Sequence, residues 1–299
     1  MKLLVIWNGG SGRSKQIDQL RMALRDHNTT WLELDRSVDL SVIIDGFILD
    51  GGQTVIAAGG DGTVHAVVNH LMKVAPSARP SMAIVPLGTA NDFAGTLNIP
   101  EPVDHAIETL NSNRVEPIDV IRIRGEGLES YYSNVAAGGN CVRVSERLTD
   151  EVKQRWGAFC YLRGAVGVLA DMQSYRLTAN VDGEVFDRLD SWAVLIANGR
   201  TNAGHIEVAP EASPVDGMMD VVIIRDGDVM DMVEIVSGNL LGNFLDCDQV
   251  IFRKAKRIGL RSDPPMRFTL DGELIDREPI EFEVVPSAIR MFVGPDFKR

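Results

Sequence analysis

The strongest constraint on the fold is a short apolar run that stops at a polar, glycine-containing loop, and this pattern occurs three times near the N-terminus. The runs cover residues 3–7, 54–58 and 82–85. Such runs are typical of strands that are buried on both faces of a sheet. Behind the second loop, apolar residues from Val64 to Met72 recur at helical spacing. We therefore expect an α/β domain, a parallel sheet flanked by helices, over residues 1–119.

The pattern changes at about residue 120, where strand-like runs begin to alternate with turn residues. Four Asp–Gly dipeptides mark turns, and they begin at Asp182, Asp216, Asp226 and Asp271. Residues 120–299 are therefore expected to form a mainly antiparallel β domain, interrupted by helices near residues 151–172 and 229–241. The segment 286–299 contains one more apolar run, which either completes this domain or returns to the first one.

The composition of the chain excludes several classes of protein and of binding partner. The chain has 299 residues and a formal net charge of -12, which favours two globular domains and disfavours a nucleic-acid partner. Its three cysteines lack the spacing of a zinc site or a disulfide framework. No apolar run approaches the roughly 18 residues of a spanning helix, and the first run is too short for a signal peptide. We expect a cytoplasmic protein.

The loop Gly59–Thr63 (GGDGT) is the first candidate for chemistry. Glycines allow the backbone to approach a phosphate, and N–H groups at the start of a helix bind anions. Asp61 is unusual there, because a carboxylate beside phosphates requires magnesium, water or a donor between them. The spacing matches neither a Walker loop nor GxGxxG. Taken alone, the loop favours a simple strand-to-helix turn.

The loop from Pro86 to Phe93 (PLGTANDF) follows the next buried strand, so it can face the same cleft as the first loop. Thr89 and Asn91 offer neutral polar contacts, and Asp92 offers a second carboxylate. We also expect Asn91 or Asp92 to cap the short helix that follows. A third loop, residues 8–13, comes after the first strand and is a weak signal by itself.

Other polar residues are expected to have structural roles. His65 and His70 are five positions apart, which does not suit a helical zinc pair, so both should lie at a helix surface or rim. Asp226, Asp228 and Asp231 should form a turn and an N-cap rather than a calcium site. Taken alone, the Asp–Gly pair at Asp271 predicts an exposed hairpin turn.

Together the three loops and the turn Leu270–Glu273 (LDGE) resemble the diacylglycerol kinase catalytic family, in its bacterial YegS-like and DgkB-like lipid kinase branch. GGDGT is shared with sphingosine kinases and NAD kinases, whereas PLGTANDFA is more specific to lipid kinases. The resemblance spans nearly the whole chain. It implies an N-terminal domain that binds ATP, a C-terminal β-sandwich and an active site in the cleft between them.

The resemblance also implies roles for individual residues. Asp271 would accept the proton of the substrate hydroxyl as a general base, supported by Glu273 and Asp92. Magnesium would bridge the phosphates and Asp61 or Asp92. The nucleotide would contact Asn8, Gly59, Gly60, Asp61, Gly62, Thr63, Gly88, Thr89 and Asn91.

The resemblance also implies a structural Mg²⁺ site built around an Asp–Gly turn, which matches residues 213–218 here. Asp216 would provide its side chain, and Ser213 and Met218 their backbone oxygens. Lys153 stands where relatives carry a lysine. The chain departs from the pattern GGDGTxNEV, because His65 and Ala66 replace the Asn–Glu pair. It departs again at Asn8, where Gly follows instead of the Pro found in many relatives.

These implications predict an ATP-dependent, magnesium-using kinase of a lipid hydroxyl, active in phospholipid biosynthesis at the membrane periphery. Diacylglycerol, phosphatidylglycerol and a sphingoid base stay open as acceptors, and so does the existence of a homodimer. The alternatives are an NAD kinase-like enzyme and a non-catalytic lipid or nucleotide sensor on the same fold. Two segments, residues 153–163 and the basic run 253–257, are candidates for lipid contact, each weighed against a purely structural role.

Overall fold

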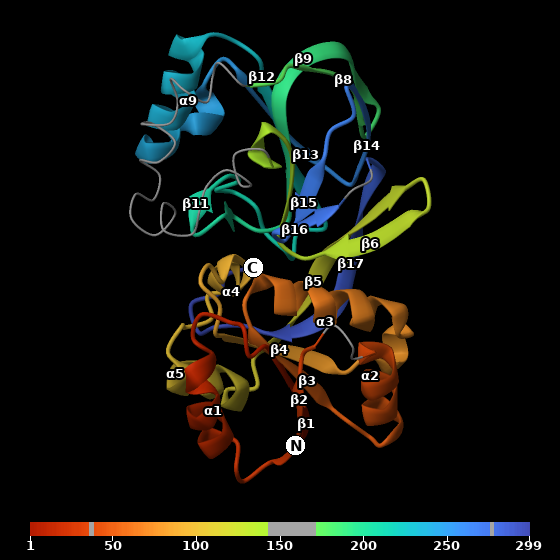
Figure 1. The fold of residues 1–299 in the computed structure, drawn as a ribbon, viewed down its shortest axis with the longest axis vertical. Helices are drawn as coiled ribbons and strands as arrows, with labels where there is room; N and C mark the ends of the chain where they lie inside the picture. The colour runs from red at the N-terminus through yellow and green to blue at the C-terminus, as the bar shows by residue number, and fades with distance from the viewer. Residues whose placement is uncertain (36–38, 143–171, 276–277) are drawn as a thin grey trace.

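The computed structural model describes residues 1–35, 39–142, 172–275 and 278–299. The helix expected near residues 151–172 falls almost entirely outside these ranges, as do Lys153 and the candidate lipid-contact segment 153–163. The chain is arranged as two stacked parts, with the N-terminal part in red to yellow below and the C-terminal part in green to blue above (Figure 1).

The N-terminal part is an α/β domain, as the sequence predicts. Its sheet contains four neighbouring parallel strands in the order β4-β3-β1-β2. In chain order its elements are β1 (Lys2–Trp7), the 3-10 helix η1 (Ser14–Gln16), α1 (Ile17–Ala23), β2 (Asn28–Glu33), α2 (Leu40–Leu49), β3 (Thr54–Gly59), α3 (Asp61–Lys73), the 3-10 helix η2 (Pro76–Ala78), β4 (Ser81–Pro86), α4 (Asp92–Thr96) and α5 (Val103–Asn111).

Sequence patterns do not predict β2 or α2. The side chains of β2 are exposed or only half-buried because it is the edge strand, so it lacks the continuous apolar run of β1 and β3. Helix α2 has apolar residues on most of its surface, so its helical period is weak, and Asp39 caps it by accepting the N–H of Ser41. The formation of β2 and α2 therefore depends on their packing against neighbouring strands and helices.

The C-terminal part is a β-sandwich made mainly of antiparallel pairs, which confirms the expected fold class. Its elements are β5 (Val115–Gly125), β6 (Leu128–Tyr132), β7 (Val135–Gly139), β8 (Tyr175–Val181), β9 (Glu184–Ala197), β10 (Thr201–Asn202), β11 (Ile206–Glu207), β12 (Met219–Arg225), α9 (Val229–Leu241), the 3-10 helix η3 (Phe244–Asp246), β13 (Val250–Ala255), β14 (Arg257–Asp263), β15 (Phe268–Leu270), β16 (Glu273–Ile275) and β17 (Pro279–Phe292).

Helix α9 has the bounds that the sequence predicts. Asp228 accepts the N–H groups of Met230 and Asp231, and Asp231 in turn accepts the N–H of Asp228. This reciprocal capping box explains the cluster of aspartates as a helix start, as expected.

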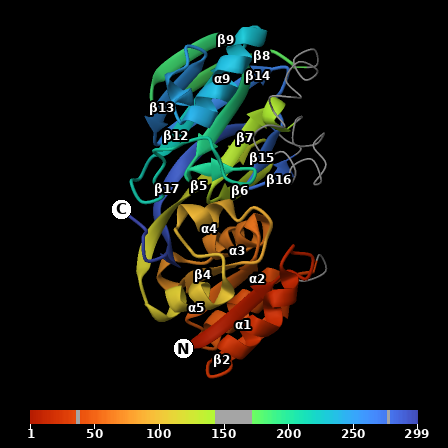
Figure 2. The ribbon, with the colours of Figure 1, turned by 90° about the vertical axis from the view of Figure 1, so that its left-hand side faces the viewer.

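The long strands β5 and β17 connect the two parts, and both views show them running from one to the other (Figures 1 and 2). They pair with each other in antiparallel register, which shifts between Val285 and Ile289. Beyond this irregularity β17 reaches the N-terminal sheet, where Met291 pairs with Met82 of β4. A single hydrogen-bonded sheet therefore continues through both parts.

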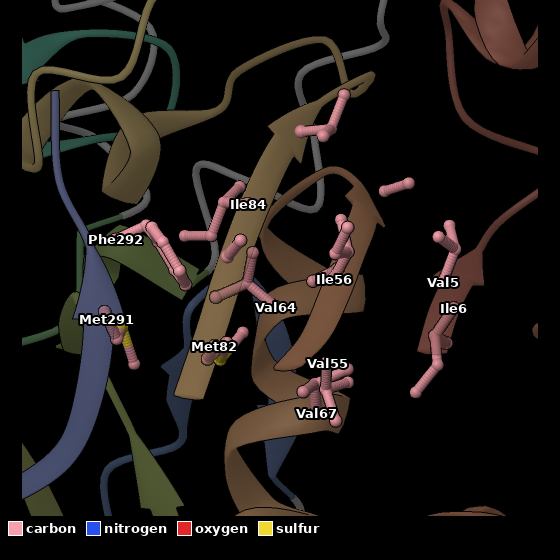
Figure 3. Packing of buried hydrophobic residues seen from close by; sticks show 14 of the residues in the cluster. Val5, Ile6, Val55, Ile56, Val64, Val67, Met82, Ile84, Met291 and Phe292 are labelled. Carbon is pink, nitrogen blue, oxygen red and sulfur yellow. The ribbon is translucent and has the colours of Figure 1, made fainter. Parts of the chain in front are cut away.

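The N-terminal core lies between the sheet and its helices (Figure 3). Strand residues such as Ile56 and helix residues such as Val64 and Val67 are fully or almost fully buried, and Met291 and Phe292 of β17 join the same cluster. Burying one such side chain contributes about 1.5–3 kcal/mol. This packing fixes α3, and with it the loop before α3, relative to the end of β17.

Candidate active site

The three loops after β1, β3 and β4 come together at the carboxyl ends of their strands. A Cβ added to Gly60 would lie 3.1 Å from the Cα of Gly88, so the loops that follow β3 and β4 are in backbone contact. A Cβ added to Gly12 would lie 3.0 Å from the Thr89 hydroxyl, and Arg13 donates its N–H to the carbonyl of Leu87 at 2.9 Å. Neighbouring parallel strands produce this cluster because their carboxyl ends share one edge of the sheet.

Asp61, which belongs to the loop after β3, caps helix α4, which follows the loop after β4. Its carboxylate accepts the N–H groups of Asp92 at 3.2 Å and Phe93 at 3.1 Å. Asn91 occupies the N-cap position with φ 55° and makes no cap bond, because its side chain instead bonds the backbone of Gly88. The expectation that Asn91 or Asp92 caps this helix is therefore wrong, and the cap comes from a tertiary neighbour.

Burial raises the pKa of Asp61 to about 6, and the nearby charges of Asp92 and Asp271 act in the same direction. Asp92 accepts the N–H groups of Gly204 at 3.0 Å and His205 at 2.7 Å, in the turn between β10 and β11. Both loop carboxylates thus hold backbone groups, and Asp92 also ties the α/β domain to the sandwich. Their proposed contact with magnesium stays a prediction.

Asp271 lies in the hairpin turn between β15 and β16, as expected, with φ 48° followed by φ 90° at Gly272. It is not an exposed turn residue, because its side chain is only 2% exposed. The carboxylate accepts the N–H groups of Ser133 at 3.0 Å, Asn134 at 2.9 Å and Val135 at 3.1 Å. These three bonds fix the carboxylate between β6 and β7.

Two further contacts bring this hairpin to the first turn of α3. A Cβ added to Gly62 would lie 2.8 Å from Oε1 of Glu273. The Nδ1 atom of His65 lies 3.4 Å from Oδ2 of Asp271, and the His65 side chain is 15% exposed. His65 is thus half-buried at the rim of its helix, one of the two positions expected for it, and it faces the sandwich. The only sequence signal for it is the departure from the family pattern at this position.

The turn implied as a magnesium site gathers oxygen donors around an ammonium group. Asp216 accepts the N–H of Met218 at 2.9 Å, and its other oxygen lies 3.0 Å from Nζ of Lys254. Lys254 also lies 3.1 Å from Asp220, whose second oxygen is buried without a hydrogen-bond partner among the described residues. Carboxylates and carbonyls, such as that of Ser213, are the donors Mg²⁺ prefers, so the residues fit the ion, although Lys254 competes for them.

Asp119 is a functional candidate that sequence reasoning misses. It is 2% exposed, and it accepts the N–H of Gly217 and the N–H of Ser287, each at 2.7 Å. Burial raises its pKa, which the two N–H donors oppose. Asp119 thereby joins the Asp216 turn to the irregular part of β17. No sequence pattern marks it, because its partners are distant along the chain.

An open groove of about 760 Å³ on the sandwich, lined by residues of β8, β14 and β17, contains no expected catalytic, nucleotide-binding or metal residue, although Lys256 and Arg257 of the basic run line it. Arg257 pairs with Glu283 at 2.8 Å. Arg253 likewise pairs with Glu184, and Lys254 with Asp216. The run 253–257 is thus largely paired with carboxylates, which favours its structural role. We therefore place the candidate active site at the three loops and Asp271.

Glycine loops at the carboxyl ends of parallel strands, facing a buried carboxylate of a β-sandwich, define a two-domain phosphate-handling enzyme. Residues 2–123 match the family model of the diacylglycerol kinase catalytic domain. Residues 133–293 match that of the YegS C-terminal NAD kinase beta sandwich-like domain. The chain belongs to the diacylglycerol kinase catalytic family with this YegS-type second domain, and it is a kinase.

Known relatives agree with this assignment. A diacylglycerol kinase of Staphylococcus saprophyticus subsp. saprophyticus is 30% identical over 82% of this chain and 78% of its own. One of Staphylococcus aureus (strain MRSA252) is 28% identical over 98% and 92%. The crystal structure of a diacylglycerol kinase from Bacillus anthracis str. Sterne has a TM-score of 0.76 at 22% identity, covering 98% and 97%. An NAD kinase from Archaeoglobus fulgidus in complex with ATP has the same fold, with a TM-score of 0.56 at 14% identity and coverage of 99% and 95%.

Proposed function

We propose that this kinase transfers the γ-phosphate of ATP to the hydroxyl of a lipid, with diacylglycerol as the first candidate and phosphatidylglycerol or a sphingoid base as others. The names of the curated relatives support the lipid class. The observation that carries the proposal is the buried Asp271 carboxylate. Three backbone N–H groups hold it beside α3, the helix that follows the loop Gly59–Thr63.

The geometry suggests where the nucleotide phosphates bind. The N–H groups of Thr63 and Val64 both donate to the carbonyl of Gly60, so among the described residues those of Asp61 and Gly62, the first two of α3, are left for an anion. The hydroxyl oxygen of Thr63 is buried and has no hydrogen-bond partner among the described residues, so a phosphate that reached it would supply one. Thr89 is exposed on the adjoining loop and offers a second hydroxyl. Bound magnesium would add neutralisation of phosphate charge.

The reaction requires one bond to form and one to break. The lipid oxygen attacks the γ-phosphorus, the bond from phosphorus to the bridging oxygen breaks, and ADP leaves. In the proposal Asp271 accepts the proton of the attacking hydroxyl, a role worth about 10²- to 10⁴-fold in rate. Because its oxygens are fixed by backbone donors, the base needs no reorganisation when the substrate arrives.

The site is proposed to act on lipid at a membrane surface from the cytoplasm. Among the helices that the structure describes, none combines the length and the apolar character needed to cross a bilayer.

The deciding experiment presents ATP and one acceptor at a time to the purified protein, with diacylglycerol, phosphatidylglycerol and sphingosine in mixed micelles and NAD in solution. We expect phosphate transfer to a lipid and none to NAD. Transfer to NAD alone would instead establish the NAD kinase alternative. Binding of ATP without transfer to any acceptor would favour a sensor.

The variant Asp271→Asn tests the base. We expect less than about a tenth of wild-type turnover while ATP binding is retained. Asparagine has only one acceptor oxygen, so a buried N–H loses its partner and unfolding becomes easier by about 1–3 kcal/mol. The assay must therefore run well below the melting temperature of the variant. Turnover close to wild type in the folded variant would remove Asp271 from this role.

A further inference from the structure

One side-chain contact joins α3, the helix after the loop Gly59–Thr63, directly to the hairpin that contains Asp271. His65 belongs to α3 in the α/β domain, and Asp271 lies between β15 and β16 in the sandwich. Their Nδ1 and Oδ2 atoms are 3.4 Å apart across 206 positions of sequence. Both side chains are largely buried, at 15% and 2% exposure, so water competes little for the contact.

Asn69 determines which ring nitrogen of His65 carries the hydrogen. The Asn69 oxygen accepts the N–H of Tyr131 and the hydroxyl of Ser130, both at 2.9 Å, so its amide nitrogen must point the other way. That nitrogen donates to the carbonyls of Tyr131 at 2.6 Å and His65 at 3.0 Å, and it lies 3.1 Å from Nε2 of His65. Because an amide nitrogen cannot accept a hydrogen bond, a hydrogen on Nε2 would have no acceptor there, so in the neutral ring Nδ1 carries the hydrogen and points it to Asp271.

The donors around Asp271 come from both parts of the chain. The N–H groups of Ser133, Asn134 and Val135 lie 2.9–3.1 Å from the carboxylate, and the Ser133 hydroxyl of the same domain lies 3.4 Å from Oδ2, as does Nδ1 of His65. Of the donors that the structure describes, only His65 comes from the α/β domain. These three N–H groups therefore orient the carboxylate within the sandwich, and His65 sets its place relative to the nucleotide loop.

We propose that His65 is a positioning residue of the phosphoryl transfer: its Nδ1–H aligns Asp271 with the loop Gly59–Thr63. The proposal rests on the function proposed above, in which Asp271 is the base. The helix geometry supports it, because Asp61, His65 and Asn69 are spaced four residues apart and share one face of α3. Helix α3 thus begins at the nucleotide loop and, through His65, also contacts Asp271.

Two substitutions separate the position of the donor from its presence. The amide nitrogen of Asn stands close to where Nδ1 of His stands, whereas that of Gln stands close to Nε2. We expect His65→Gln and His65→Ala to lower kcat by about tenfold or more with the KM for ATP changed less than about twofold, because a small misplacement of a reacting group costs rate rather than nucleotide binding. His65→Asn should retain most of the wild-type kcat.

His70→Ala is the matched control. His70 lies on the same helix and bonds the hydroxyl of Ser41 at 2.6 Å, away from Asp271, so its loss should leave kcat unchanged. A second measurement needs no lipid: hydrogen exchange of the amides of residues 133–135, which Asp271 holds. Exchange there should be faster in His65→Gln than in wild type, and unchanged in His65→Asn.

Two outcomes would overturn the inference. The first is a kcat in His65→Ala and His65→Gln equal to that of the wild type. The second is an equal loss in the Asn and Gln variants, since the position of the donor would then not matter. If the wild type phosphorylates no lipid, the proposed function fails, and equal exchange at residues 133–135 in all variants would independently exclude the positioning role.

Discussion

Removing the ammonium group of Lys254 is the perturbation whose consequences the structure specifies most fully. Nζ lies 3.0 Å from Asp216 and 3.1 Å from Asp220, and it also donates to the carbonyl of Glu211 at 3.2 Å. Burial opposes its charge, but the carboxylates of Asp216 and Asp220 outweigh that effect and raise the pKa of Lys254. Lys254→Met keeps the apolar part of the side chain as far as Cε, removes the ammonium group and leaves the two carboxylates facing each other.

The loss of folding free energy in Lys254→Met depends on how exposed the ion-paired side chains are. Removing one partner of a fully buried ion pair costs about 3–5 kcal/mol, and an exposed pair contributes about 0–1 kcal/mol. The side chains of Lys254 and Asp216 are each 32% exposed, whereas that of Asp220 is 2% exposed. We therefore expect a loss of about 2 kcal/mol at neutral pH, or about 5 °C in melting temperature.

The loss should depend on pH in a defined direction. Burial raises the pKa of Asp220 to about 6, and Lys254 opposes that rise. A carboxyl group with a raised pKa in the folded state contributes stability below its unfolded value of 3.8, and this is lost as the pH rises through the folded value. Without Lys254 the folded pKa rises further, so the variant should be much less stable than wild type at pH 8 and only slightly less stable at pH 5.

Thermal unfolding with and without Mg²⁺ completes the test, with Lys256→Met as the control for losing an exposed ammonium. Mg²⁺ should raise the melting temperature of the wild type through the Asp216 turn, more so in Lys254→Met, where no ammonium competes, and less in Asp216→Ala. If Lys254→Met melts like the control at pH 8, the reasoning about the ion pair is refuted. An equal response to Mg²⁺ in all three proteins would place its binding elsewhere.

The remaining predictions concern the loops. Gly88→Ala should weaken ATP binding at least tenfold, because its Cβ would overlap the Cα of Gly60, which is backbone and cannot rotate away; unchanged affinity by titration would contradict this. Gly62→Ala should be milder, since its Cβ meets only the movable end of Glu273. The pKa of Asp61 is raised to about 6, so its contribution to stability should be lost as the pH rises from about 4 to 6. Asp61→Asn should flatten that part of the stability profile in denaturant titrations, and an unaltered slope would exclude Asp61 as its source.

Local pattern is sufficient for much of the fold. The apolar runs of β1, β3 and β4 record burial that is continuous along the chain, and the apolar residues of α3 record burial at helical spacing, so the sequence pattern predicts these elements. The glycine loops are visible in the same way, because a loop must interrupt an apolar run. The edge strand β2 and the largely apolar helix α2 lack that contrast and escape prediction.

The roles within the site depend on tertiary structure. Sequence motifs pick out Asp61 and Asp271 as residues, but not that one caps α4 and the other is buried under three backbone N–H groups. Nor does any pattern relate His65 to Asp271 or Lys254 to Asp216. The physical reason is that hydrogen bonds and ion pairs act over about 3 Å, whereas these partners are far apart along the chain, and only folding brings them within that range.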